Sequence, residues 1–268
     1  MIDESTNSDC FYSQTIARLK ALHLLSPESR ILVVCGSYLD RDVLLDAGFA
    51  SVVISNLDSR MVGDEFSPFE WSYQNAESLS FEDEEFDFVL VHSGLHHCHS
   101  PHRALLEMYR VARKGVLLFE PYDNLLTRLG VKLNFGQQYE HAAVFYNDCK
   151  FGGVNNSEIP NYVYRFSKAE IEKSILTFDP LAKSKFHYFF RMAIPWKQIE
   201  GRKKPGLAIL VRLMYPVMKL VEFVFPEQCN NFAALILKPE LPGDLHPWIQ
   251  WRDGKAIVNK EWLEQTYQ

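Results

Sequence analysis

The chain of 268 residues is long enough for one large α/β domain or for one domain with substantial insertions. Its apolar fraction of 47% excludes disorder as the default, and its net charge of -6 disfavours a general nucleic-acid binder, which is usually basic. Five cysteines without CxxC spacing fit a reducing compartment, and residues 1–10 lack the apolar run of a signal peptide, so we expect a cytoplasmic protein.

The first part of the chain predicts a strand–helix–strand unit. Residues 12–25 carry apolar side chains at helical spacing, and residues 31–34 form an apolar, mostly β-branched run that is typical of a buried parallel strand. Asp40 is placed to cap the next helix, and residues 51–55 form a second apolar strand. Ligands bind open α/β sheets at the carboxyl ends of strands, so the small-residue turn at 35–37 is a candidate binding loop.

The alternation of strand and helix patterns continues beyond this unit. Further strands are expected at 71–74, 86–91 and 116–119. Ser100 and Pro101 open a helix that Gly115 closes. The acidic run 82–85 is expected to be a solvated turn, with a metal or basic-partner site as the functional alternative. This rhythm predicts an α/β fold with a doubly wound, Rossmann-like sheet that is mostly parallel.

The pattern then breaks. Residues 121–165 are rich in Tyr, Asn and Gly with little periodicity, and a loop-rich insertion of this length is expected to be functional. Ser167 and Glu170 form a capping box at the start of a helix. Two more strands are expected at 181–192 and 231–237, the last one antiparallel. The tryptophans of the polar tail are expected to pack back onto the body.

The stretch from Gly206 to Pro226 is almost wholly apolar and predicts an added helix with its charges on one narrow side. Three charges and Pro216 count against a membrane span. The first interpretation is a helix packed on the domain or in a homodimer interface. The alternatives are a lid over the active site and a membrane-surface helix near a lipid-linked substrate.

A family resemblance is carried by Phe86–Pro121, FDFVLVHSGLHHCHSPHRALLEMYRVARKGVLLFEP, with its strand, Leu-His-His turn, helix and second strand. Residues 75–81, NAESLSF, look like Asp-Ala-Glu-x-Leu-Pro-Phe. Over residues 28–121 the chain resembles the class I S-adenosylmethionine-dependent methyltransferases, particularly the small-molecule branch typified by ubiquinone and menaquinone methyltransferases. The resemblance implies one methyltransferase-like domain over 1–268, with a cofactor-binding core at 28–121, a substrate-cap insertion at 122–165, a C-terminal helix and strands at 166–238 and a tail at 239–268.

The resemblance implies S-adenosylmethionine as the cofactor and assigns the strand-end turns to it. Gly36 would let the backbone approach the methionine part of the ligand. Asn56 stands where the family has an acidic residue for the ribose hydroxyls, with Asp58 as the alternative, and Asn75 stands where an Asp meets the adenine. A neutral amide accepts a weaker hydrogen bond than a carboxylate. The implied cofactor residues are Cys35, Gly36, Ser37, Asn56, Leu57, Asp58, Asn75, Ala76, Glu77, His92 and Ser93.

Histidines cluster between residues 92 and 102. His and Cys are zinc ligands, but adjacent residues on one short turn are not expected to converge on one ion, and no distant Cys/His pair completes the set, so we expect no metal. His96, His97 and Glu120 are the candidate bases, because a hydroxyl acceptor must lose its proton. The glycine-rich fingerprint of dinucleotide enzymes and the P-loop motif are both missing from the sequence.

The insertion combines aromatic faces with hydrogen-bonding groups, which suits a polyol or sugar, although an irregular surface loop has the same composition. The candidate acceptor-binding residues are Tyr122, Tyr139, Tyr146, Asn156, Tyr162, Tyr164 and Arg165. We therefore expect O-methylation of a sugar or another small polar metabolite, as in surface-polysaccharide biosynthesis, with a small-molecule acceptor as partner. The alternatives are a non-catalytic binding or scaffold protein of the same fold, and a carbon methyltransferase for a quinone-like lipid.

Overall fold

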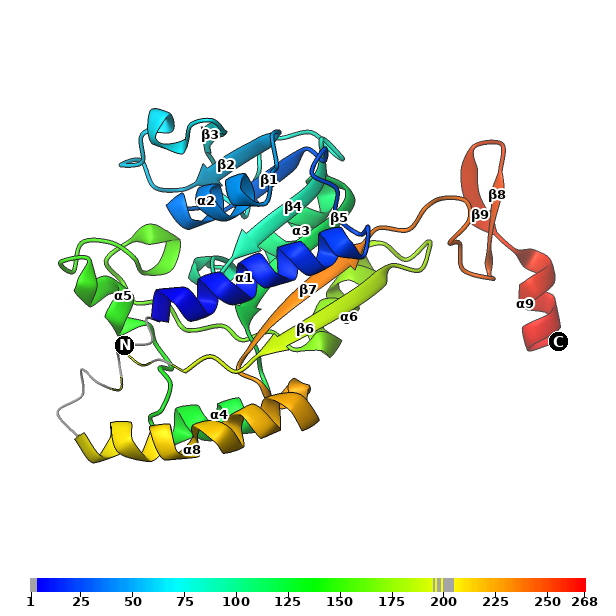
Figure 1. Cartoon of the computed structure of the whole chain (residues 1–268). Coiled ribbons are helices and arrows are strands. Elements are labelled where there is room, and N and C mark those ends of the chain that lie inside the picture. Colours follow the sequence, from blue (N-terminus) through cyan, green and yellow to red (C-terminus); the bar gives the residue numbers. More distant parts are fainter. Residues whose placement is uncertain (1–3, 195, 197–198, 200–204) are drawn as a thin grey trace.

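The computed structural model describes residues 4–194, 196, 199 and 205–268, and its centre is one seven-stranded sheet (Figure 1). The strand order is β3-β2-β1-β4-β5-β7-β6. The strands are β1 (Ile31–Val34), β2 (Val52–Asn56), β3 (Glu70–Tyr73), β4 (Phe86–His92), β5 (Ala112–Pro121), β6 (Lys185–Arg191) and β7 (Asn231–Leu237). β7 runs antiparallel to both of its neighbours, whereas the pairs from β3 to β5 are parallel. The predicted α/β fold, mostly parallel with an antiparallel last strand, is confirmed.

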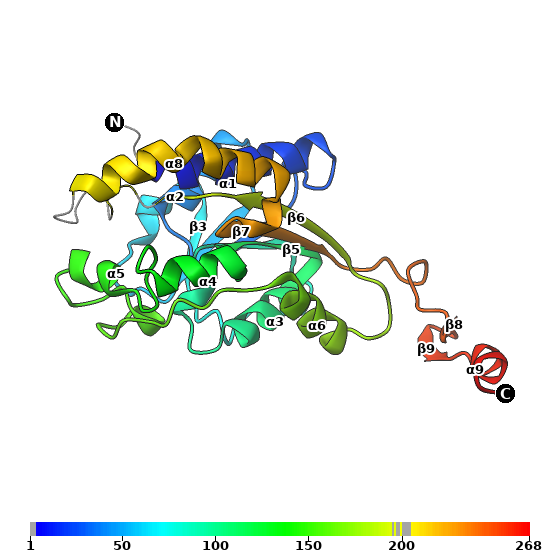
Figure 2. The ribbon, with the colours of Figure 1, turned by 90° about the horizontal axis from the view of Figure 1, so that it is seen from below.

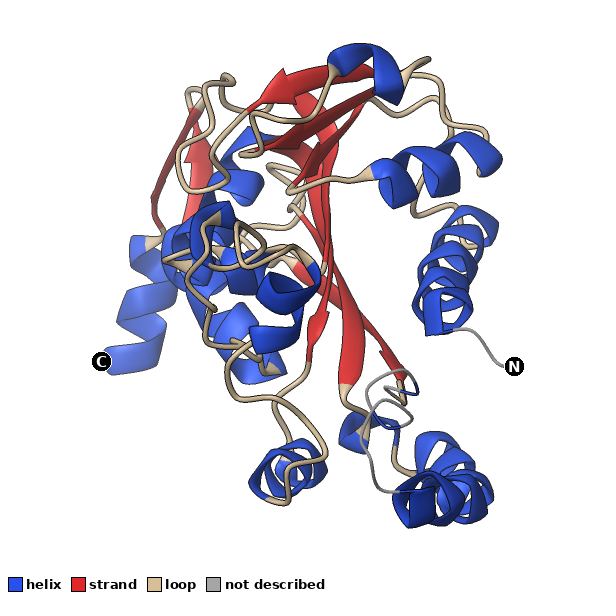
Figure 3. Ribbon diagram, turned by 90° about the vertical axis from the view of Figure 1, so that its left-hand side faces the viewer, coloured by secondary structure: helices blue, strands red, loops and turns tan. Residues whose placement is uncertain are grey.

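Helices cover both faces of this sheet, as the view along its edge shows (Figure 3). The described α-helices are α1 (Glu4–Ala21), α2 (Tyr38–Asp46), α3 (Pro101–Val111), α4 (Leu125–Lys132), α5 (His141–Tyr146), α6 (Lys168–Phe178), α8 (Pro205–Val224) and α9 (Lys260–Tyr267). Short 3₁₀ turns are η1 (Gly63–Phe66), η2 (Leu95–His97), η3 (Val154–Asn156) and η4 (Pro226–Gln228). Figure 2 shows α3 and α6 together on one side of the sheet and α1 on the other.

The apolar strands form the core because their side chains alternate between these two layers. Leu32 and Val34 of β1 belong to the cluster under α3 and α6, whereas Ile31 and Val33 belong to the cluster under α1 and α2. The residues of β1 are at most 1% exposed. A continuous apolar run, rather than an alternating one, is what a strand buried on both faces requires.

Several element boundaries differ from the sequence-based expectation. α1 begins at Glu4, eight residues before the predicted start at 12. Ser37, not Asp40, is the N-cap of α2, and Asp40 completes the capping box from the third helical position. α3 ends at Val111, and Gly115 lies inside β5, where an added Cβ would be 2.4 Å from the carbonyl oxygen of Ile236. Sequence periodicity alone gives no sign of that contact with β7.

The segment 121–165 is less irregular than expected, because α4, α5 and η3 all lie within it. Asn124 caps α4 through its side chain, which accepts a hydrogen bond from the backbone N–H of Thr127 at 2.9 Å. Both helices are short, at eight and six residues, so their periodicity is hard to detect in a sequence. The capping box at Ser167 and the helix α6 are confirmed.

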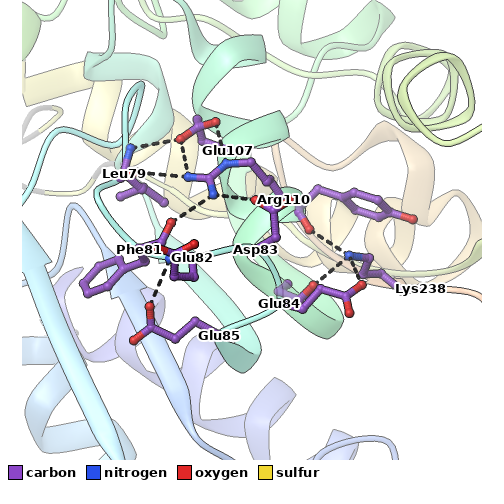
Figure 4. Close-up of polar contacts among 11 residues, drawn as sticks. Leu79, Phe81, Glu82, Asp83, Glu84, Glu85, Glu107, Arg110 and Lys238 are labelled. Carbon is purple, nitrogen blue, oxygen red and sulfur yellow. Dashed lines mark hydrogen bonds and ion pairs between the residues drawn. The ribbon is translucent and has the colours of Figure 1, made fainter.

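The acidic run 82–85 is a surface turn that two basic residues hold in place (Figure 4). Arg110 forms an ion pair with Asp83 at 2.8 Å and also donates to the carbonyl oxygens of Phe81 and Leu79. Lys238 forms an ion pair with Glu84 at 3.1 Å. These contacts connect the turn to α3 and to the end of β7, so its acidic groups have a structural role.

The C-terminal tail forms a small unit of its own beyond the sheet, with the hairpin β8 (Ile249–Arg252) and β9 (Lys255–Val258) followed by α9 (Figure 1). Its backbone contacts the body near residues 244–246, where Lys183 donates to the carbonyl oxygen of Asp244 at 3.0 Å. Trp248 stacks on His246 and contacts Trp262. These two aromatic side chains therefore pack within the tail, contrary to the expectation that they pack onto the body.

Two further expectations concern disulfide bonds and membrane-spanning helices. All five cysteines are free thiols in the structure, as expected for a chain without a disulfide framework. Among the described residues, none of the helices combines the length and apolarity that crossing a bilayer requires.

Candidate functional site

The loops after β1 and β4 touch each other at the carboxyl edge of the sheet. Cys35 and Ser93 adopt positive φ angles of 52° and 54° at the ends of these strands. A Cβ on Gly94 would lie 2.4 Å from Cβ of Cys35, and a Cβ on Gly36 would lie 2.6 Å from Cγ2 of Ile54. Packing within the fold therefore already requires both glycines, a reason for Gly36 that the sequence did not reveal.

The polar residues after β2 and β3 are engaged by the protein itself. The Asn56 side chain donates to the carbonyl oxygen of Gly36 at 2.8 Å and so supports the first loop. Asp58 forms an ion pair with Arg60. The hydrogen bonds from Arg60 outweigh the opposing effect of burial and lower the pKa of Asp58. The guanidinium of Arg60 lies over the ring of Phe151, which brings the insertion against the end of β2.

Two members of the predicted cofactor set have local structural partners. Asn75 accepts a hydrogen bond from the backbone N–H of Glu77 at 3.0 Å, which is the geometry of an Asx turn. The carboxylate of Glu77 accepts from the backbone N–H groups of His99 and Ser100, at 3.2 and 2.8 Å, and holds the loop before α3. Ala76 is buried in the core. Asp58 and Glu77 are thus occupied by protein groups.

Helix α1 packs on the ends of β4 and β5, through contacts of Tyr12 with His92 and Phe119, which the sequence did not predict. Tyr12 is fully buried and stacks on His92, with ring centroids 4.6 Å apart and planes 5° apart. Its hydroxyl donates to Oδ1 of Asp40 at 3.1 Å. Oδ2 of Asp40 accepts from the backbone N–H and the hydroxyl of Ser37, and burial raises the pKa of Asp40 despite these contacts. This network connects α1 and α2 with His92, one of the predicted cofactor residues.

Glu120 lies at the end of β5 and organises the turn after β4. Its carboxylate is buried and accepts from the backbone N–H groups of Gly94 and Leu95 at 2.9 and 2.7 Å. Its other oxygen is 2.6 Å from Nδ1 of His96. One carboxylate therefore fixes both the backbone of η2 and the orientation of the first imidazole of the Leu-His-His turn.

Glu140, which sequence reasoning missed, approaches the same histidines from the insertion. Its Oε2 is 3.3 Å from Nε2 of His96 and 3.5 Å from Nε2 of His97. The Asn161 side chain donates to the carbonyl oxygen of His96 at 2.9 Å and to Oε2 of Glu140 at 3.4 Å. The three predicted catalytic residues, His96, His97 and Glu120, are therefore brought together, with Glu140 as a fourth member.

The charges of this cluster hold its members in different protonation states. Burial alone would lower the pKa of His96, but Glu120 and Glu140 outweigh it and raise that pKa to about 10. Burial raises the pKa of Glu140, but the hydrogen bond and charge of His96 outweigh it and lower that pKa to about 2. Burial and the charge of His96 lower the pKa of His97. The two carboxylates thus keep His96 charged, and the charge of His96 together with burial favours the neutral form of His97.

A cavity of about 880 Å³ opens beside this cluster. Its polar end is formed by Ser93, His96, Glu140, Arg165 and Asn231. Its apolar walls come from the region of α4 and from α8, and include Leu126, Val131, Phe135, Leu210, Val211, Met214, Val217, Met218 and Val221. The added helix therefore forms one wall of a cavity that reaches the carboxyl ends of β4 and β5.

The predicted acceptor-binding residues are not gathered around this cavity. Of the seven, Arg165 lines it. Tyr122 is buried against Phe190 and Phe232, and Tyr164 forms a hydrogen bond with Glu170. Tyr139 and Tyr162 contact each other at the surface, Tyr146 is 73% exposed, and Asn156 lies beside Asp58. Composition placed these residues correctly in the insertion but could not show which way each side chain points.

The part of the chain that forms the strand-end loops also matches a known protein family. Residues 32–119 match the family model described as a methyltransferase domain, which indicates S-adenosylmethionine as the cofactor. No curated protein matches the sequence of the chain at a significant level. The matched segment extends from β1 to β5 and so contains the predicted cofactor loops and η2.

Solved structures share the fold at low sequence identity. The magnesium protoporphyrin IX methyltransferase of Synechocystis PCC 6803, solved with bound SAH, is 13% identical, with a TM-score of 0.50 over 87% of this chain and 84% of its own. The (4+2)-cyclase SpnF is 14% identical, with a TM-score of 0.50 over 85% and 80%. A SAM-dependent methyltransferase of Archaeoglobus fulgidus is 13% identical, with a TM-score of 0.48 over 84% and 93%. The fold is the Rossmann-like fold of class I methyltransferases.

Proposed function

We propose that the protein is an S-adenosylmethionine-dependent methyltransferase whose acceptor is an amphipathic small molecule. The observation that carries this proposal is the cavity, which has a polar end at Ser93 and His96 and apolar walls from α4 and α8. A site of this kind takes a molecule with one polar head and an apolar body. The matched methyltransferase domain supports the reaction class.

The strand-end loops are the proposed cofactor site, with Gly36, Ser37, Asn56 and Ser93 as its contacts. The support for this assignment is the geometry of the turns, since the chain takes a positive φ angle at Cys35 after β1 and at Ser93 after β4. Asp58 and Glu77 are left out because donors from Arg60 and from the loop before α3 occupy their carboxylate oxygens, whereas the contact of Asn56 with Gly36 uses its Nδ2 donor and not its oxygen. S-adenosylmethionine supplies an activated methyl group, so the chain contributes chiefly by positioning the acceptor.

The acceptor proposed here differs from the sugar that the composition of the insertion suggested. That hypothesis depended on stacking by tyrosines that the structure places at the surface or in the core, as described above. An acceptor of the quinone-like kind, with a hydroxyl-bearing or carbon-nucleophile head and an apolar tail, is better matched to the cavity. Its head would lie near Arg165 and the histidine cluster, and its tail between Val131 and Met214.

Calorimetry with S-adenosylmethionine and S-adenosylhomocysteine tests the cofactor, and transfer of a labelled methyl group tests the acceptor. The assay compares alkylated phenols and quinols with nucleotide sugars. Met214→Asp places a charge on the cavity wall, and we expect it to lower kcat/KM for the alkylated acceptor by roughly tenfold or more. Leu213→Asp is the matched control, because the neighbouring Leu213 is 71% exposed and outside the cavity lining.

Each result has a defined meaning. Failure of both cofactor compounds to bind at millimolar concentration would refute the methyltransferase and leave the non-catalytic alternative. Efficient transfer to nucleotide sugars that Met214→Asp leaves unchanged would refute the amphipathic acceptor alone. Transfer to alkylated acceptors that is lost in Met214→Asp and kept in Leu213→Asp is the outcome we expect.

A further inference from the structure

Three ligand-type side chains converge beside the cavity from two distant segments. His96 and His97 are adjacent on the turn η2, and Glu140 precedes α5 in the insertion. One ligand atom of each lies within 4.8 Å of the others. The sequence argued against a metal because adjacent histidines were not expected to converge and no distant Cys/His pair completed the set. In the structure both rings approach Glu140, so the first reason does not hold, and a carboxylate stands in place of the missing Cys/His pair.

We propose that His96, His97 and Glu140 bind a divalent transition-metal ion of the zinc, cobalt or manganese kind. Metal–ligand bonds of about 2.1 Å in tetrahedral geometry place neighbouring donor atoms about 3.4 Å apart. The distances from Oε2 of Glu140 to Nε2 of His96 and His97 are 3.3 and 3.5 Å. Two imidazole nitrogens and one carboxylate oxygen suit first-row transition metals better than Mg²⁺ or Ca²⁺, which prefer oxygen ligands.

Glu120 supplies the outer partner that such a site needs. Histidines that bind metals usually donate their second ring N–H to a carboxylate, which fixes the tautomer and the ring orientation. Nδ1 of His96 is 2.6 Å from Glu120, which leaves Nε2 directed at Glu140. An ion that binds Nε2 replaces the proton that this nitrogen carries in the metal-free imidazolium, and the proton is released to solvent. Glu120 is itself fixed by two backbone N–H groups, so the first ligand is oriented before any ion binds. Glu120 is thus a positioning residue in this proposal.

The remaining coordination positions would face the cavity. His96 and Glu140 both line it, so an ion between them is accessible to the polar head of an acceptor. Oδ1 of Asn161 is buried and has no hydrogen-bond partner among the described residues. Nδ2 of the same side chain donates to the carbonyl oxygen of His96 and to Oε2 of Glu140. A water on the ion would be one way to satisfy such an oxygen. The idea that the ion contacts the acceptor head rests on the proposed function. The binding of the ion to the three side chains does not depend on that function.

The competing interpretation is an ion pair without metal, in which the two ring N–H groups donate to Glu140. Both arrangements use the same three side chains, and only direct binding experiments distinguish them. Co²⁺ is the appropriate probe, because its visible d–d absorption reports nitrogen ligands and coordination geometry independently of methyl transfer. Zn²⁺ can then be measured by competition, with Mg²⁺ and Ca²⁺ as ions that should not displace Co²⁺.

The experiment uses the full chain after dialysis against EDTA. We expect one Co²⁺ per chain, a visible band that Zn²⁺ removes, and at least tenfold weaker binding in His97→Gln and Glu140→Gln. His99→Gln is the matched control, because His99 is exposed on the same segment and outside the cluster. Glu120→Gln should also weaken binding, and Glu120→Asp should restore part of it, since a carboxylate can accept at both oxygens, from the backbone of η2 and from Nδ1–H of His96, whereas an amide accepts at only one.

A wild-type chain without the band, or a band that persists in His97→Gln and Glu140→Gln, would overturn the metal site. Calorimetry with S-adenosylmethionine on the same variants separates this outcome from failure of the proposed function. Normal cofactor binding with no Co²⁺ band refutes the metal alone, and a normal band without cofactor binding refutes the methyltransferase alone. Circular dichroism of each variant excludes loss of binding through unfolding.

Discussion

The hydrogen bond between Tyr12 and Asp40 gives the sharpest test of how α1 is attached to the site. Tyr12→Phe removes the hydroxyl that donates to Oδ1 of Asp40 at 3.1 Å, and it leaves the ring and its stacking on His92 unchanged. The two residues are 0% and 2% exposed, so water cannot replace the lost donor. Loss of a buried hydrogen bond to a charged group costs about 1.5 to 3 kcal/mol, and we expect about 2 kcal/mol here.

The assay is urea unfolding at pH 7, read as the free energy of unfolding. Tyr38→Phe is the matched control, because its hydroxyl also bonds a carboxylate, that of Glu65, but its side chain is 41% exposed. Solvent can replace that partner, and we expect a change within about 0.5 kcal/mol. The comparison isolates burial, since both variants delete one phenolic hydroxyl from a tyrosine–carboxylate pair.

A double-mutant cycle with Asp40→Asn completes the test. Because the hydrogen bond from Tyr12 favours the charged carboxylate, the effects of the two substitutions should be coupled by about 1 kcal/mol or more. Equal losses in Tyr12→Phe and Tyr38→Phe would refute the argument from burial. Additive effects in the cycle would show that the two side chains act independently, and that α1 is held by its apolar contacts alone.

Two further predictions concern the sheet. The carboxyl of Asp87 has its pKa lowered to about 2, because Arg113 and other donors outweigh the opposing effect of burial. Asp87→Asn should therefore cost about 1 to 2 kcal/mol at pH 7, and the difference from wild type should vanish as the pH falls from about 4 to about 2, as urea titrations at several pH values would reveal. Gly115→Ala should cost more than about 2 kcal/mol in thermal unfolding, because its Cβ would meet the carbonyl oxygen of Ile236. Gly130→Ala, which meets nothing within 4 Å in the helix α4, should be neutral or stabilising; similar losses in both variants would contradict the packing argument.

The central sheet could be predicted because its signals are local. β1 and residues 88–91 of β4 are continuous apolar runs, and such runs are typical of strands buried under helices on both faces. Ser100 with Pro101, and Ser167 with Glu170, mark helix starts through hydrogen bonds that span three residues. Each of these signals lies within a few neighbouring residues. The strands β1 and β4 and the starts of the helices α3 and α6 are accordingly found where the sequence predicts them.

The contacts that close the site could not be predicted in this way. Glu140 meets His96 across a separation of 44 residues, and Tyr12 meets Asp40 across 28. No periodic pattern or short motif specifies such a pair, because each partner alone is an ordinary Glu or Tyr. The orientation of the tyrosines in the insertion could not be predicted for the related reason that composition does not reveal side-chain direction.

The position of the insertion nevertheless follows from the cluster that it completes. Glu120 orients His96 from the sheet side, and its partners Gly94 and Leu95 belong to the same turn, so this half of the cluster forms with the sheet. Glu140 and Asn161 approach from the insertion and contact the exposed side of the same two histidines. The Glu140 side chain is 28% exposed, and desolvating even part of a carboxylate costs free energy that its cationic partner offsets, so the contact with His96 favours docking of the insertion on η2. The charge of the histidine turn therefore selects the conformation of the insertion, and with it the shape of the polar end of the cavity.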